Sequence, residues 1–370
     1  MEKALMQIMF GLTVGIGPAL RRDLLVAFGS LEALWHSSPS ERLQVKGYNP
    51  KAEAAWQQRG QYQAQAASEL AWMKGHQINT MFWGQPDYPT CLSHCSDPPT
   101  LLYYRGKKIS PDARFISIVG TRNNSHYGKR ETEKLVAALP KNAVVVSGLA
   151  TGIDQIAHQA ALEAGLDTIA VLAHGLEKIY PTVHRPLAIQ IMQQGALWTE
   201  NHSFNKMGAF SFPRRNRIVA GMSPVTVVIE SDTEGGSMIT ANDAFGYGHS
   251  VYALPGRVYD SKSKGTNDLI QINRAQLYTS PEWLMTELGW NSGATTNGTL
   301  FSGAEMETGG RSALADKIYL TLLQNEKMHI DQLLHQSQLT HAQLAGALLE
   351  LELMGCLQAM PGQWYALQQA

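Results

Sequence analysis

Short aliphatic runs alternate with amphipathic segments between residues 115 and 256. The runs are rich in β-branched residues and indicate buried strands at 115–120, 143–148, 167–173, 196–200, 224–230 and 250–256. The segments between them repeat apolar residues at helical spacing and predict helices at 127–139, 153–164, 185–194, 213–222 and 237–246. This alternation predicts an α/β fold with a Rossmann-like, doubly wound and mostly parallel sheet.

The chain before this sheet has a helical pattern, so residues 1–77 are predicted to form an N-terminal helical domain. Within it, Leu12–Trp35 resembles a helix-hairpin-helix (SAM-like) module. In such modules the backbone of the hairpin, here Gly15–Gly17, approaches a phosphate, with Arg21 and Arg22 nearby. A small helical packing domain is the alternative. Strand-like pieces within 78–106 lead into the sheet, so the sheet domain is predicted to span 78–288.

The chain after the sheet begins with a segment rich in Gly, Thr, Asn and Ser, and 289–311 is therefore predicted to be a flexible linker. Residues 312–370 then show three short amphipathic helices, at 315–324, 330–336 and 340–354, followed by a strand pair. This order resembles a winged helix. The helix at the position of a recognition helix carries Glu350 and Glu352 and neither Lys nor Arg, so a protein-contact or structural role competes with DNA binding.

Composition narrows the class of protein. A chain of 370 residues with 44% hydrophobic residues is long enough for two or three domains. It has no apolar run of 18 residues, so no membrane association is expected and a cytoplasmic location is predicted. Cys91, Cys95 and Cys356 are too few for a disulfide framework, and nothing near the first two completes a metal site. We therefore expect no metal and no cofactor.

Charge is distributed unevenly, although the formal net charge is only −1. No Asp or Glu occurs between residues 201 and 229, a stretch that holds four cations. Distribution matters more than the sum for a nucleic-acid partner. This stretch is therefore a candidate contact surface.

Small and polar residues gather where the predicted strands end. Because the carboxyl ends of parallel strands share one edge of a sheet, we expect four turns to lie together and to bind phosphate. The candidate residues are Gly120, Thr121, Arg122 and Ser125 in the first turn, Ser147 and Gly148 in the second, Lys206, Phe210, Phe212, Arg214, Arg215, Asn216 and Arg217 in the third, and Gly235, Gly236 and Ser237 in the fourth. Cations beside aromatic rings suit single-stranded nucleic acid, which offers both phosphates and open base faces.

The second turn, between a strand and a helix, is expected to present free backbone N–H groups to an anion. Thr151 is predicted to cap that helix, with Asp154 as its capping-box partner. Asp154 and His158 are four residues apart, and we interpret them as a local hydrogen bond plus a cap rather than a metal or acid–base pair. No Ser/His/Asp or Cys/His set has a credible order, so no catalytic residue is predicted.

Six segments in this order resemble the DNA-processing protein DprA (Smf) family: GTRNNSHYG, SGLATGIDQIAHQAAL, FPRRNRIVAGMS, EGGSMITANDA, ALPG and KGTNDLIQ. The resemblance places the family's G-S/T-R motif on residues 120–122 and its FPxRNR motif on 212–217. It implies a single-stranded DNA (ssDNA) binding protein that loads the recombinase RecA onto incoming strands in natural transformation and works as a homodimer. Single-strand-binding protein is a further candidate partner. The chain departs from the family's pattern at 173–174 and 273–275.

Two alternatives remain open. The same sheet resembles the nucleotide phosphoribohydrolases, whose Gly-rich phosphate motif supplies a catalytic Glu. Here Asn242 and Asp243 stand near that position, and Met238 replaces the motif's third Gly, so the acid that the hydrolysis needs is missing. The other alternative is a scaffold whose anion-binding turns bind nothing.

Overall fold

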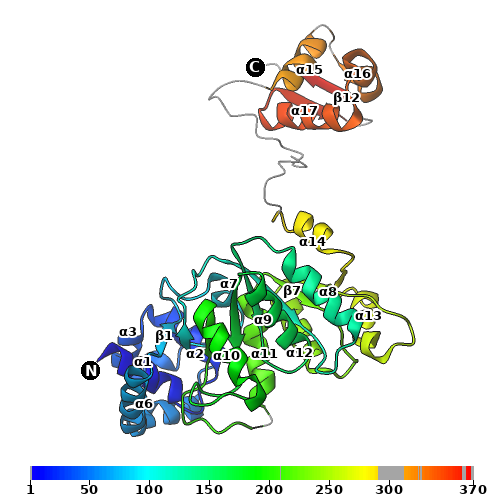
Figure 1. Ribbon diagram of the computed structural model, residues 1–370. Coiled ribbons are helices and arrows are strands. Elements are labelled where there is room, and N and C mark those ends of the chain that lie inside the picture. The colour runs from blue at the N-terminus through cyan, green and yellow to red at the C-terminus, as the bar shows by residue number, and fades with distance from the viewer. Residues whose placement is uncertain are drawn as a thin grey trace. The chain divides into compact units, whose positions relative to one another are not determined.

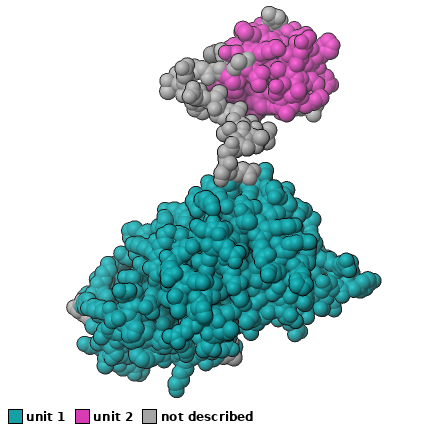
Figure 2. Space-filling model, viewed as in Figure 1, with its two compact units in different colours: residues 1–292 teal, residues 293–370 magenta. Residues whose placement is uncertain are grey.

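The protein is described by a computed structural model that covers residues 2–208, 210–290, 312–323, 325, 327–360 and 364–367 (Figure 1). The chain divides into two compact units, residues 1–292 and 293–370 (Figure 2). The segment 289–311, predicted to be a linker, lies outside the described residues from 291 onward.

The first unit is built on one nine-stranded sheet with the order β1-β2-β6-β5-β4-β3-β7-β8-β9. The strands are β1 (Asn79–Phe82), β2 (Leu101–Gly106), β3 (Arg114–Val119), β4 (Ala143–Ser147), β5 (Asp167–Val171), β6 (Ala196–Thr199), β7 (Val225–Val228), β8 (Ser250–Ala253) and β9 (Gln276–Leu277). All neighbours from β6 to β9 are parallel, whereas β2 pairs antiparallel with both β1 and β6. The mostly parallel Rossmann-like sheet is thus confirmed.

Helices cover both faces of the sheet because the central strands are apolar on both sides. Val144 and Val146 of β4 belong to one buried cluster and Val145 to the other. The first cluster receives α7 (Thr90–Ser93), α11 (Ser211–Met222), α12 (Gly236–Gly246) and α13 (Lys264–Gln271), which follows the short 3₁₀ helix η3 (Ser261–Ser263). The second receives α8 (His126–Ala137), α9 (Ile153–Glu163) and α14 (Pro281–Glu287). A further cluster packs α10 (Arg185–Gln194), preceded by η2 (Thr182–His184), against β5 and β6.

The N-terminal helices share a core with β1 and β2, in which Phe10 and Trp56 are fully buried. They are α1 (Lys3–Leu12), α2 (Pro18–Phe28), α3 (Leu31–His36), α4 (Pro39–Arg42), α5 (Pro50–Gln57), η1 (Gln58–Tyr62) and α6 (Gln63–Gly75). Two helices do flank the Gly15 turn, but Arg21 and Arg22, which were expected near a phosphate, form hydrogen bonds within the protein. Arg21 donates to the carbonyl of Thr13, and Arg22 donates to carbonyls in the 95–96 turn.

The second unit is a winged helix, as predicted. It contains α15 (Ala313–Leu323), α16 (Ile330–Ser337), α17 (His341–Leu353) and the three-stranded sheet β10 (Met328–His329), β12 (Trp364–Leu367) and β11 (Leu357–Met360), in that order. The sequence did not indicate β10, because two residues carry no detectable alternation.

Candidate nucleic-acid interface

Two adjoining cavities, of about 460 and 160 Å³, lie at the carboxyl ends of β3, β4, β5 and β7. The chain leaves β3 toward β4 on one side and leaves β7 toward β8 on the other, so the sheet changes winding direction between β3 and β7. Open α/β sheets bind ligands at such a switch point. The four predicted turns therefore do meet, and each contributes residues to the larger cavity.

Arg122 and two aromatic rings form an accessible ladder that lines the smaller cavity. The Arg122 guanidinium carbon lies 5.7 Å from the centroid of the Phe212 ring, and the centroids of the Tyr180 and Phe212 rings are 6.0 Å apart. Arg122 is exposed and has no ion pair with any described residue. Phe210 nearby is 81% exposed. A cation and partly exposed aromatic rings thus lie together in the lining of the smaller cavity.

The predicted anion site in the turn after β4 is filled by the protein itself. A carboxylate oxygen of Asp154 accepts the N–H groups of Gly148 (3.1 Å) and Ala150 (3.3 Å). The predicted cap at Thr151 is wrong, because α9 begins after Gly152 without a side-chain cap. Burial raises the pKa of Asp154, and the nearby Arg215 opposes that shift. A carboxylate inside the turn leaves these two amides unavailable to phosphate.

The turns after β3, β4 and β7 are bonded to one another. Thr121 donates its N–H to the carbonyl of Glu230 (2.6 Å), and its own carbonyl accepts the N–H of Ile153 (3.2 Å). Gly152 has φ +82°, and a Cβ there would lie 2.3 Å from the Thr121 carbonyl. Only glycine fits this approach. The position of Arg122 is thereby fixed by three strand ends at once.

The predicted hydroxyl donors also serve the scaffold. Ser125 donates its hydroxyl to the buried Glu230 carboxylate (2.5 Å) and accepts from the first turn of α8. Ser147 donates to a carbonyl of β3, and Ser237 donates to the hydroxyl of Ser231. Sequence reasoning assigned these three hydroxyls to phosphate. The structure instead uses them to hold the turns.

The arginine cluster on α11 divides into one exposed side chain and two buried ones. The guanidinium of Arg215 donates to the carbonyls of Gly148 and Val171 (2.7 Å for the latter). Arg217 forms a buried ion pair with Glu200, 2.5 Å between Nη2 and Oε2. Arg214 keeps 59% of its side chain exposed. All three arginines were predicted to contact nucleic acid, but the guanidinium groups of Arg215 and Arg217 are buried against partners within the protein. Arg214, whose Nε lies 3.6 Å from Oε1 of Glu200, is the one of the three that stays accessible.

Gly120, Gly235 and Gly236, which were predicted to bind phosphate, line the larger cavity. Asn216 reaches this wall from α11 and donates to the carbonyl of Gly236 (3.1 Å). Asn216 therefore positions the Gly-rich turn.

Glu69 of α6 is a site residue that sequence reasoning missed. It is 1% exposed and accepts the N–H of Ser203 (2.9 Å) together with the Ser203 hydroxyl. Ser203 anchors the segment that carries Lys206 and Phe210, so an N-terminal helix holds the aromatic and basic loop. The sequence did carry a signal, because Glu69 has the helical spacing that places it on the same face of α6 as the buried Ala66 and Met73.

His174, where the chain departs from the family's pattern, shapes the smaller cavity. It is 2% exposed, its Nδ1 donates to the carbonyl of Gly175 (2.8 Å), and its Nε2 accepts the N–H of Tyr180 (3.1 Å). Burial lowers its pKa, so the neutral ring persists at neutral pH. The neutral tautomer holds Tyr180 beside Phe212.

The residues of the hydrolase alternative lie away from both cavities. Asn242 accepts from Arg274 (2.7 Å), and burial together with Asp97 raises the pKa of Asp243 to about 6.

The predicted hydrogen bond between Asp154 and His158 is absent, and His158 pairs instead with Thr168 (2.8 Å). Within the described part of the chain, no three His, Cys, Asp or Glu side chains are grouped so as to hold a metal ion. Nor does any described helix combine the length and apolarity that a membrane crossing needs.

Comparison with known proteins agrees with this geometry. A family model described as DNA recombination-mediator protein A matches residues 79–289, and one described as the DprA winged helix domain matches 303–363. The chain belongs to the DNA recombination-mediator protein A family. The DprA/Smf resemblance read from the six segments is thus confirmed.

Relatives of this family match most of the chain. Protein Smf of Synechocystis sp. is 32% identical over 386 residues, 95% of each chain, and Protein Smf of Escherichia coli is 33% identical over 82% of this chain and 81% of its own length. The X-ray structure of DprA from Streptococcus pneumoniae superposes with a TM-score of 0.67 at 29% identity, covering 78% of this chain and 99% of that one. DprA from Helicobacter pylori, whose structure is described for its ssDNA binding mode, gives 0.52 at 32% identity over 57% of this chain and 95% of that one.

Proposed function

We propose that this DprA-family chain binds ssDNA along the carboxyl edge of its sheet. The observation that carries the proposal is the ladder of Arg122, Phe212 and Tyr180 in the lining of the smaller cavity. The guanidinium neutralises a phosphate, and the rings stack on bases that a duplex keeps covered. The ssDNA binding of the Helicobacter pylori relative supports the same assignment.

Of the predicted contacts, we retain those that the structure leaves accessible: Arg122, Lys206, Phe210, Phe212, Arg214 and the backbone of Gly120 and Gly236. The backbone groups of Thr121 and Gly235 are bonded within the protein. The remaining candidate residues hold the turns in position through bonds within the protein. Since Asn242 and Asp243, which stand near the position of the hydrolase's catalytic Glu, line neither cavity, we propose a binding protein and not an enzyme.

The test is a fluorescence-anisotropy titration of labelled oligo-dT at several salt concentrations. Arg122→Ala removes one charge-assisted contact worth about 1.5 to 3 kcal/mol, so its affinity should fall about 10-fold to 150-fold. The slope of log affinity against log salt should decrease by about 0.7. Arg130→Ala, which removes an exposed cation paired with Glu131 outside the cavities, is the matched control and should bind like the wild type. Equal affinities for the two variants would refute the proposal.

We further propose, from the family relationship, that the chain acts in the cytoplasm as a homodimer and loads RecA onto strands coated with single-strand-binding protein during natural transformation. RecA filament growth on coated strands should accelerate when the chain is added. Arg122→Ala, which weakens the DNA contact, should need a higher concentration for the same effect.

We propose that the winged helix is not the DNA reader. Glu350 of α17 accepts both the N–H and the hydroxyl of Ser312 (2.7 and 2.6 Å), so this acid holds its own unit together. Between His341 and Leu353, α17 carries no Lys or Arg. A recognition helix without cations gives phosphate nothing to pair with.

A further inference from the structure

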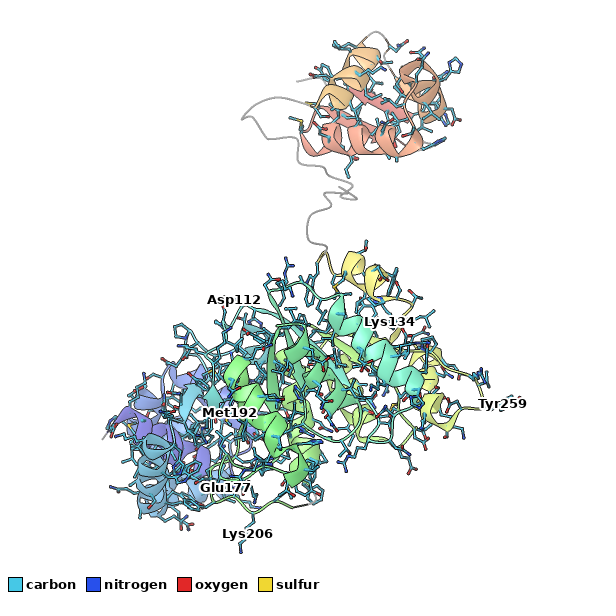
Figure 3. All side chains as sticks on the ribbon, viewed as in Figure 1. Asp112, Lys134, Glu177, Met192, Lys206 and Tyr259 are labelled. Carbon is cyan, nitrogen blue, oxygen red and sulfur yellow. The ribbon has the colours of Figure 1, made fainter. Side chains whose placement is uncertain are left out.

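The loop between β8 and η3 projects an aromatic side chain into solvent. Tyr259 is 97% exposed and Val258 is 77% exposed, although most rings of the chain are packed. Figure 3 shows Tyr259 standing out from the body of the first unit, well away from Lys206. An exposed Tyr beside an exposed Val has no packing role in this unit.

Hydrogen bonds hold the base of this loop to the body of the first unit. Gly256 and Asn267 exchange hydrogen bonds of 3.2 and 3.1 Å, and the hydroxyl of Tyr127 donates to the carbonyl of Pro255 (3.2 Å). At the tip, the N–H of Asp260 donates to the carbonyl of Arg257 (3.0 Å). A held platform loses less entropy on binding than a free loop does.

The loop adjoins the cavities at the same edge of the sheet. Ser231, which lines the larger cavity, donates its N–H to the carbonyl of Lys262 (2.7 Å), and its carbonyl accepts the N–H of Gly265 (2.9 Å). The tip therefore extends the rim that begins at Gly235 and Gly236. A strand leaving the larger cavity on this side meets the loop next.

Three cations lie within five residues of Tyr259 along the chain: Arg257, Lys262 and Lys264. Their side chains make no ion pair or hydrogen bond with any residue that the structure describes. Asp260, an acid within the loop, accepts the N–H of Lys262 with a carboxylate oxygen (3.0 Å). Unpaired cations beside an open ring match a phosphate and the base attached to it.

Resting on the ssDNA function proposed above, we propose that Tyr259 is a second base-stacking platform, with Arg257, Lys262 and Lys264 as its phosphate contacts. Asp232 lines the larger cavity on this side, and the exposed Glu234 follows it in the same turn, so this turn carries two negative charges that repel a phosphate backbone. The tip thus acts as a separate anchor, which only a strand long enough to span that turn can reach.

The test compares two lengths of oligo-dT, about 6 and about 20 nucleotides. One single-strand-binding fold typically covers about 4 to 16 nucleotides, so the shorter oligomer is near the lower limit of one site and the longer one exceeds the upper limit. Tyr259→Ser should weaken binding of the longer oligomer about fivefold or more, the effect of losing one stack, and leave the shorter one unchanged. Tyr259→Phe keeps the ring and should restore the longer complex. Val26→Ser, at an apolar position of α2 that is 65% exposed, is the surface control.

A second variant tests the cations. Replacing Arg257 and Lys264 by Gln should lower the salt slope for the longer oligomer by up to about 1.4. Unchanged affinity and slope for the longer oligomer in both variants would overturn the tip proposal and leave the cavity site intact. Equal losses for both lengths would also overturn it. If the wild type binds neither oligomer, the proposed function fails and this inference fails with it.

Discussion

Arg217→Ala separates a scaffold arginine from a DNA contact. The Arg217 and Glu200 side chains are 9% and 8% exposed and form an ion pair of 2.5 Å, while the other guanidinium nitrogen donates to the carbonyl of Asp97. Truncation leaves the Glu200 carboxylate buried without its main partner, which costs about 3 to 5 kcal/mol. Arg214 remains 3.6 Å from Glu200, so we expect the lower end, about 3 kcal/mol. That is a large part of the roughly 5 to 15 kcal/mol that stabilises a domain.

Urea denaturation followed by tryptophan fluorescence measures this loss, since Trp198 is buried within the sheet unit. The midpoint should fall with an unchanged slope. Arg214→Ala touches the same Glu200 from an exposed position and should change stability by less than about 1 kcal/mol. Replacing both partners, by Arg217→Met with Glu200→Gln, should recover most of the loss. A wild-type midpoint for Arg217→Ala combined with weak dT binding would refute the reasoning and restore Arg217 as a contact.

Four further outcomes are expected. Phe210→Leu should weaken dT binding by about 1 to 3 kcal/mol without changing thermal stability, since the ring is 81% exposed, and Phe212→Leu should weaken it similarly, since this ring lines both cavities. Glu69→Ala should lower both dT affinity and stability, and Glu69→Gln, which keeps one acceptor, should recover part of each. Burial lowers the pKa of His158 from an ordinary 6.5 to about 3. The stability that the neutral, buried ring contributes is therefore present above pH 6.5 and is lost as the pH falls toward 3. In the same urea assay, the free energy of unfolding of the wild type should fall by on the order of 2 kcal/mol more between pH 7 and pH 5 than that of His158→Asn. Truncation to residues 1–289 should retain most dT affinity, and a 100-fold loss would make the winged helix a DNA reader.

Periodicity carried the prediction of the sheet because its central strands are apolar on both faces, as Val144, Val145 and Val146 show. The strand-like pieces within 78–106 were predicted to lead into the sheet, but periodicity did not indicate that β2 pairs antiparallel with β6, since that pairing joins distant segments. Periodicity also predicted the winged helix, because three amphipathic helices follow one another before the strand pair.

The candidate site was predicted in place but not in detail. Residue type located Arg122, Phe210 and Phe212 but missed Tyr180, which the structure places beside Phe212. It also could not distinguish Arg122 from Arg215 and Arg217, which have the same chemistry and are buried. Their partners come from segments far along the chain. The same distance hid Glu69, which lies 134 residues from Ser203.

The central claim is that ssDNA lies across the carboxyl edge of the sheet at Arg122 and Phe212. A crystal structure of the chain with bound oligo-dT tests it most directly. We predict a phosphate within hydrogen-bonding distance of the Arg122 guanidinium and a base stacked on Phe212, Phe210 or Tyr180. A strand bound only to the winged helix or to the Gly15 hairpin, with both cavities free of DNA, would contradict the account.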